Sequence, residues 1–74
     1  MSRLPTLKPK DVLAALQRAG FSVARVRGSH YQLLNPSTNR RVTVPHHTHD
    51  LSKATLASIL KQADLATEEF LKLL

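Results

Sequence analysis

The residues best suited to chemistry stand together at one point of the chain. They are Arg25 and Arg27, followed by Gly28, Ser29 and His30. Histidine both accepts and donates protons near neutral pH, which makes it the commonest general acid or base. Arginine offers a phosphate two parallel N–H donors. The combination predicts acid–base chemistry on a polyanion, and RNA is the polyanion that suits it best.

Charge is distributed unevenly along the 74 residues, which carry a net charge of +6. Residues 1–49 contain eight of the 11 Lys and Arg residues and one acid, Asp11, whereas residues 50–74 are slightly acidic. A sequence pI of about 10.6 is typical of nucleic-acid binding. A solvated surface that only keeps the protein soluble has the same composition. The charge therefore permits an RNA-binding face in the first two thirds of the chain without requiring it.

Cleavage of RNA needs little beyond a proton acceptor, a proton donor and cations, because the 2′-OH is the nucleophile. His30 can take one of the proton-transfer roles. A metal-dependent nuclease needs clustered carboxylates, and Asp11 is the only acid before residue 50. We therefore predict a catalytic His30 and a reaction without metal or cofactor. The predicted RNA-contacting residues are Arg25, Arg27, Gly28, Ser29, Arg40, Arg41 and His47.

A second proton-transfer group is missing from the sequence around His30. Either one of the histidines at 46, 47 and 49 folds close to it, or His30 works alone with modest efficiency. These three histidines could instead share a zinc ion, but Asp50 is the only adjacent acid that could support them. We therefore predict no metal site and give His47 a structural or RNA-facing role.

The first helix and strand are predicted from apolar spacing. Pro9 suits the first turn of a helix, Asp11 complements the positive end of its dipole, and an apolar stripe continues to Gly20. A strand is expected over Phe21–Arg27. Its alternation places one set of side chains on the same face, namely Phe21, Val23, Arg25 and Arg27. The alternation alone leaves open which face is buried.

A hairpin is expected next, because Gly28 and Ser29 form a tight turn between two alternating segments. The second strand should run from His30 to Leu34. Its alternation directs Tyr31 toward the core and His30 away from it.

The turn-forming residues 35–39 then lead to a third strand over Arg40–Pro45. Ser52 is expected to cap a second helix, and Thr67 a last short one that carries Phe70. The order α-β-β-β-α predicts an α+β fold, with a three-stranded antiparallel sheet, helices on one face and a short C-terminal helix. We expect one domain over residues 1–74.

The order of elements resembles the double-stranded RNA-binding fold. A finer pattern resembles the HicA family of bacterial toxins over Lys8 to Phe70. It consists of Gly20-Phe21, Arg25, Gly28-Ser29-His30, Val44-Pro45, His47, Leu51, Thr55-Leu56 and Ile59-Leu60. The resemblance implies a type II toxin that cleaves mRNA, with a catalytic His30 and inhibition by a HicB-family antitoxin. Two positions depart from the family pattern, since Ala54 and Asp64 stand where glycine is common.

Two other functions remain open at this point. The chain could be a non-catalytic RNA-binding module that uses the same basic face, or a protein-interaction module whose partner is acidic. The sequence has no cysteine, no apolar run that would span a membrane, and no signal-peptide pattern in residues 1–10. We therefore expect a cytoplasmic protein that meets single-stranded mRNA and no membrane.

Overall fold

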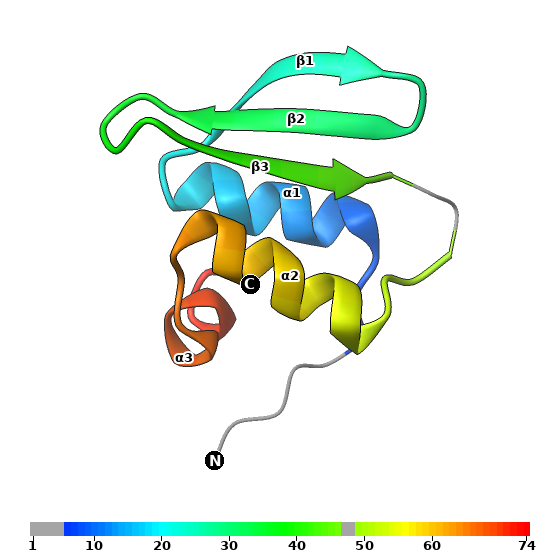
Figure 1. Cartoon of the computed structure of the whole chain (residues 1–74). Helices are drawn as coiled ribbons and strands as arrows, with labels where there is room; N and C mark the ends of the chain where they lie inside the picture. Colours follow the sequence, from blue (N-terminus) through cyan, green and yellow to red (C-terminus); the bar gives the residue numbers. More distant parts are fainter. Residues whose placement is uncertain (1–5, 47–48) are drawn as a thin grey trace.

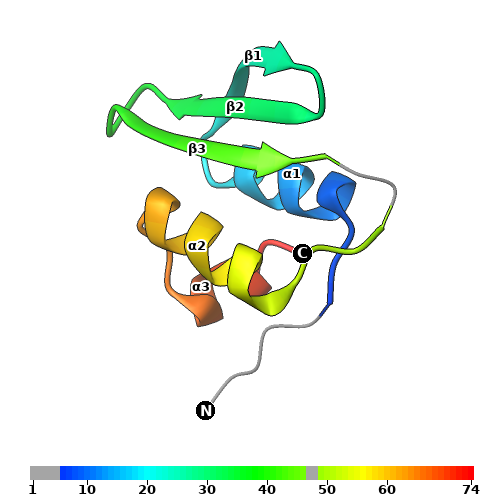
Figure 2. The ribbon, with the colours of Figure 1, turned by 45° about the vertical axis from the view of Figure 1, so that its right-hand side comes forward.

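The computed structural model describes residues 6–46 and 49–74, and every structural statement below concerns these residues. The elements follow the order α1 (Pro9–Arg18), β1 (Ser22–Arg27), β2 (His30–Asn35), β3 (Arg40–Pro45), α2 (Lys53–Ala63) and α3 (Thr67–Leu71). The three strands form one antiparallel sheet in the order β1-β2-β3. All helices lie on the same side of this sheet (Figures 1 and 2). The predicted α+β fold is confirmed.

Local chemistry explains where the two longer helices begin and end. Pro9 is the first residue of α1, where a missing N–H costs nothing, and Gly20 follows the helix at a φ of +104°. Ser52 caps α2, because its Oγ accepts a hydrogen bond from the Thr55 N–H at 3.1 Å. The helix ends at Asp64 in the left-handed conformation, with φ 58° and ψ 42°.

The start of α3 differs from the prediction. The residue at the N-cap is Ala66, and Thr67 is already the first helical residue, so the predicted Thr67 cap is wrong. An alanine has no side-chain oxygen to offer the helix. The Ala66 N–H instead donates to Oε1 of Glu69 at 3.4 Å, half of the reciprocal arrangement found in capping boxes.

The core lies between the sheet and the helices. Its buried hydrophobic members are Val12, Leu13, Ala15, Leu16, Phe21, Leu33, Val42, Val44, Leu51, Leu56, Ile59, Leu60, Ala63 and Phe70. Phe70 comes from α3 and is fully buried, so the short last helix is part of the core rather than an appendage. A β-bridge between Leu7 and Leu51 joins the segments that precede α1 and α2.

A β-bulge interrupts the pairing of β1 with β2. Val23 lies opposite Leu33, but Arg25 lies opposite Gln32, so Ala24 is an extra residue on β1. Directly opposed residues share a face of the sheet. Val23 therefore lies on the helix side with the buried Leu33, whereas Arg25 lies on the other side. The predicted grouping of Val23 with the two arginines is wrong, because strict alternation ends at Ala24.

The two edges of the sheet differ. All six residues of β1 are exposed, and α2 packs against β3 at the other edge. The backbone N–H of Thr43, which points away from β2 at the edge of the sheet, donates to Oε1 of Gln62 on α2 at 3.0 Å. Helices therefore cover one face and the β3 edge, while no helix in the part of the chain that the structure describes covers the opposite face of the sheet. No helix within residues 6–46 and 49–74 has the length and apolar character to cross a membrane.

Candidate functional site

The turn between β1 and β2 presents His30 at the start of the central strand. Gly28 has a φ of +59°, in the left-handed region that glycine tolerates best. Glycine in the first of two turn positions is typical of a type II′ hairpin, whose twist matches that of the strands. A Cβ at Gly28 would meet no atom within 4 Å. The backbone conformation, and not a lack of space, therefore requires glycine there.

His30 is exposed and lies between Arg27 on β1 and Pro45 on β3. These three residues belong to the outer face, by which we mean the face of the sheet turned away from the helices. By the register its members are Ser22, Arg25, Arg27, His30, Gln32, Leu34, Arg41, Thr43 and Pro45. None of these is acidic, so His30 sits on a cationic surface. The predicted outward orientation of His30 is confirmed.

A hollow of about 360 Å³ lies on this outer face, and its lining begins on β2 at Gln32, two residues after His30. It is lined by Ala24, Arg25, Gln32, Leu33, Leu34, Arg41, Val42 and Thr43. The side chains of Leu33 and Val42 are buried on the helix side, so these residues contribute main chain to its floor. Two arginines, an amide and a hydroxyl around one concavity are donors suited to an anion.

The neighbouring arginines of β3 point in opposite directions. Arg41 is opposite Leu34 and lies on the outer face, whereas Arg40 is opposite Asn35 and lies on the helix side. Arg40 Nη1 donates to the carbonyl oxygen of Gln62 at 3.5 Å, and its Nη2 is 3.6 Å from Oδ2 of Asp64. The structure thus brings Arg25, Arg27 and Arg41 together with His30 but leaves Arg40 at the end of α2.

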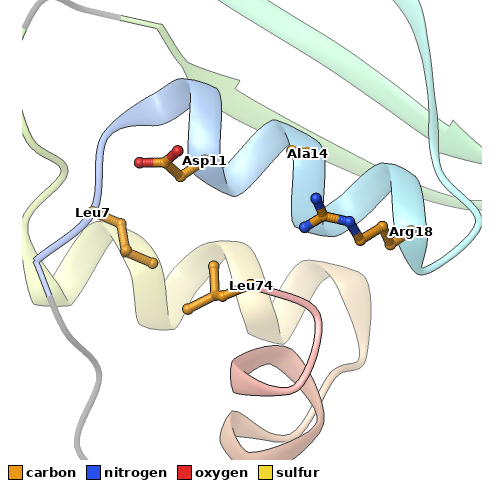
Figure 3. Close-up of a pocket in the computed structure, with 5 residues that line it drawn as sticks. All are labelled: Leu7, Asp11, Ala14, Arg18 and Leu74. Carbon is orange, nitrogen blue, oxygen red and sulfur yellow. The ribbon is translucent and has the colours of Figure 1, made fainter.

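A second cavity, of about 220 Å³, lies on the opposite side of the molecule between α1 and the C-terminal segment (Figure 3). Its lining residues are Leu7, Asp11, Ala14, Arg18 and Leu74. Arg18 donates from Nη1 to the carbonyl oxygen of Leu73, which fastens that segment to α1. The described residues that line this cavity include no histidine and no convergent set of donors, so we assign it a structural role.

A model of the HicA toxin family of bacterial toxin–antitoxin systems matches residues 9–65, which is most of the chain. The chain belongs to the HicA toxin family. It is therefore a toxin of a bacterial toxin–antitoxin system, and an antitoxin is its partner. No curated protein matches the chain significantly. The HicA match covers α1 through α2 and includes the whole outer face, whereas α3 lies beyond it.

His46 cannot serve as the second proton-transfer group, because it lies on the helix side of the sheet and His30 lies on the outer face. The imidazole ring of His46 stacks on Tyr31 with centroids 4.8 Å apart and an interplanar angle of 27°, and the backbone N–H of His46 donates to the carbonyl oxygen of Ser29 at 2.6 Å. Tyr31 packs against the core from the helix side, as predicted. His46 consequently supports the turn from behind while His30 faces outward. His47 lies outside the described residues.

The described residues of this HicA-family chain do not form a metal site. Within residues 6–46 and 49–74, no group of three His, Cys, Asp or Glu side chains lies close enough to hold an ion. His49 and Asp50 are exposed.

Two residues of the outer face were missed as functional candidates by the sequence reasoning, namely Gln32 and Thr43. They lie opposite each other on β2 and β3 and line the hollow. A period of two counted from His30 places Gln32 on the same face, and this was the available signal. Thr43 lies between the apolar Val42 and Val44 in the predicted third strand, and this alternation was the corresponding signal for its outward position.

Proposed function

We propose that this toxin is a metal-independent endoribonuclease that cleaves mRNA, with His30 as a general acid or base. The observation that carries the proposal is the shared outer face of His30, Arg25 and Arg27. It arises from the tight turn at Gly28, which pairs Arg27 with His30 and, two residues further along each strand, Arg25 with Gln32. The bulge at Ala24 then lets Val23 lie on the helix side while both arginines stay on the outer face.

The chemistry asks for one proton transfer from His30 and charge stabilisation from arginine. The 2′-oxygen attacks the adjacent phosphorus and loses its proton, the bond from phosphorus to the 5′-oxygen breaks, and that oxygen gains a proton. The products are a 2′,3′-cyclic phosphate and a 5′-hydroxyl. His30 takes one of the two proton transfers, and water takes the other. The absence of a second general acid or base slows the reaction, and each tenfold loss of rate corresponds to about 1.4 kcal/mol of activation free energy. A toxin that only needs to cut some of the messages tolerates such a slow rate.

The shape of the outer face suits single-stranded RNA. Arg27 is directly opposite His30 and is the cation placed best to stabilise charge on the reacting phosphate. The backbone of Gly28 and Ser29 borders the same position. A shallow, exposed sheet face accepts an extended RNA strand whose phosphates run over it. Since the proposed substrate is mRNA, we also expect the activity in the cytoplasm.

Inhibition follows from the same surface. A HicB-family antitoxin that covers His30 and the arginines of the outer face excludes RNA, so antitoxin binding and cleavage are mutually exclusive. Acidic side chains on the antitoxin would complement this face, which has no acid of its own.

The test compares the purified chain with His30→Ala on a labelled single-stranded RNA in EDTA, with the DNA of the same sequence as a second substrate. His30 is exposed, so the substitution should leave the fold intact, and Lys10→Gln on α1 serves as a surface control. We expect cleavage of RNA alone, lost in His30→Ala, retained in Lys10→Gln and blocked by the antitoxin. RNA binding without cleavage by all variants would instead indicate a non-catalytic RNA-binding module.

A further inference from the structure

We propose that the hollow between Arg25 and Arg41 binds the phosphate one nucleotide away from the bond that His30 cleaves. This inference rests on the proposed function and adds a substrate subsite to it. The minimal good substrate would then carry two phosphates, one at His30 and one in the hollow.

The arginines of the described chain fall into two groups by their contacts. Arg40 and Arg18 are held by protein groups, since Arg40 contacts the end of α2 and Arg18 bonds the Leu73 carbonyl. Arg25, Arg27 and Arg41, in contrast, form no hydrogen bond or ion pair with the described residues and are exposed, and two of them, Arg25 and Arg41, line the hollow. A guanidinium without a protein partner beside a concavity is available for an external anion.

The register places these two arginines on either side of β2. Arg25 on β1 is opposite Gln32, and Arg41 on β3 is opposite Leu34. Since adjacent strands lie about 5 Å apart, the two backbones flank β2 at a separation of about 10 Å. Two arginine side chains, each several bonds long, reach a phosphate above Gln32 from both sides. The Gln32 amide and the Thr43 hydroxyl add neutral donors from below.

The position of the hollow relative to His30 sets the distance between the two phosphates. Gln32, which borders the hollow on the side of His30, follows His30 by two residues on the same face of β2, which is about 7 Å along a strand. This matches the separation of neighbouring phosphates in an extended single strand. Arg27 beside His30 and the hollow beside Gln32 therefore receive consecutive phosphates.

The experiment uses a DNA oligonucleotide with one ribonucleotide, A, C, G or U in turn, so that only one bond can be cut. One phosphate at a time is replaced by a neutral methylphosphonate, either next to the scissile bond on its 5′ or 3′ side or several nucleotides away. We expect about a tenfold slower cleavage for one of the two neighbouring positions, since a charge-assisted contact is lost, and little change for the remote one.

Arg41→Gln shows whether the hollow is responsible. It should slow cleavage of the unmodified oligonucleotide, and the neighbouring methylphosphonate should then have a smaller effect than on the natural chain, because only Arg25 still contacts the phosphate and interacting groups are non-additive. Lys10→Gln should keep the full methylphosphonate effect. Independent, multiplying effects in Arg41→Gln, or no effect at either neighbouring position, would overturn the subsite.

Failure of the proposed function is distinguishable from failure of the subsite. If neither this oligonucleotide nor a single-stranded RNA is cut, the nuclease assignment is wrong. The effects of Arg41→Gln and of the neighbouring methylphosphonate, alone and combined, are then measured on the Kd of the all-deoxy oligonucleotide. Purely additive effects on the binding free energy would overturn the anion site itself.

Discussion

Arg27 and His30 lie directly opposite each other across the β1–β2 hairpin, and only Gly28 and Ser29 separate them in the chain. The pairing puts a permanent cation next to the candidate general acid or base without any long-range contact. Its geometry depends on a single left-handed residue, Gly28, with a φ of +59°. The register of the whole outer face starts from this turn.

Gly28→Ala should lower the free energy of unfolding by about 1–2 kcal/mol, because an L side chain is strained in the left-handed region. Open space around this position means that no steric clash adds to the strain. Ser29→Ala is the matched control in the same turn and should change stability by less than about 0.5 kcal/mol. Urea unfolding of both variants measures the difference, and equal stability of the two would contradict the conformational role of Gly28.

The sequence predicted the hairpin and the outward His30 because both depend on residues close together in the chain. The bulge at Ala24 was not predictable in this way. The adjacent apolar residues Val23 and Ala24 break the polar–apolar alternation of Ser22 to Arg27, but this break does not specify a bulge. Only the pairing with β2 identifies Ala24 as the extra residue. Arg40 differs again, since its engagement with α2 is a contact between residues 22 positions apart.

Asp64 ends α2 in a conformation that glycine adopts more easily. Asp64→Gly should be as stable as the natural chain or more so, because relief of the left-handed strain outweighs the loss of an exposed ion pair with Arg40. Asp64→Ala removes the same carboxylate but keeps the strain, so it should be less stable than Asp64→Gly by about 1 kcal/mol. Thermal or urea unfolding decides this, and a more stable alanine variant would show that the helix end does not need the left-handed residue.

Gln62 covers the edge of β3 by accepting the hydrogen bond of the Thr43 N–H. Gln62→Ala should destabilise the fold by about 0.5–1 kcal/mol and speed hydrogen exchange at the Thr43 amide. Gln62→Glu keeps an acceptor at this position and should retain the protection of that amide. Unchanged exchange at Thr43 in Gln62→Ala would mean that the contact does not protect the edge.

Phe70 links α3 to the core, although the family match ends at residue 65. Phe70→Ala should destabilise the protein by about 3–5 kcal/mol, a large part of the stability of a domain this small. Leu74→Ala is the control, since Leu74 is 48% exposed, and should lose less than about 1 kcal/mol. Chemical denaturation compares the two variants. A loss of less than about 1 kcal/mol in Phe70→Ala would show that residues beyond the family match are dispensable for folding.

The measurement that tests the central claim most directly is the identity of the ends produced from a short single-stranded RNA in EDTA, by the natural chain and by His30→Ala. Attack by the 2′-OH with proton transfer through His30 predicts a 2′,3′-cyclic phosphate and a 5′-hydroxyl from the natural chain, and at least a hundredfold slower formation of both in the variant. Products that end in 5′-phosphate and 3′-hydroxyl, or the same rate from His30→Ala, would contradict the account.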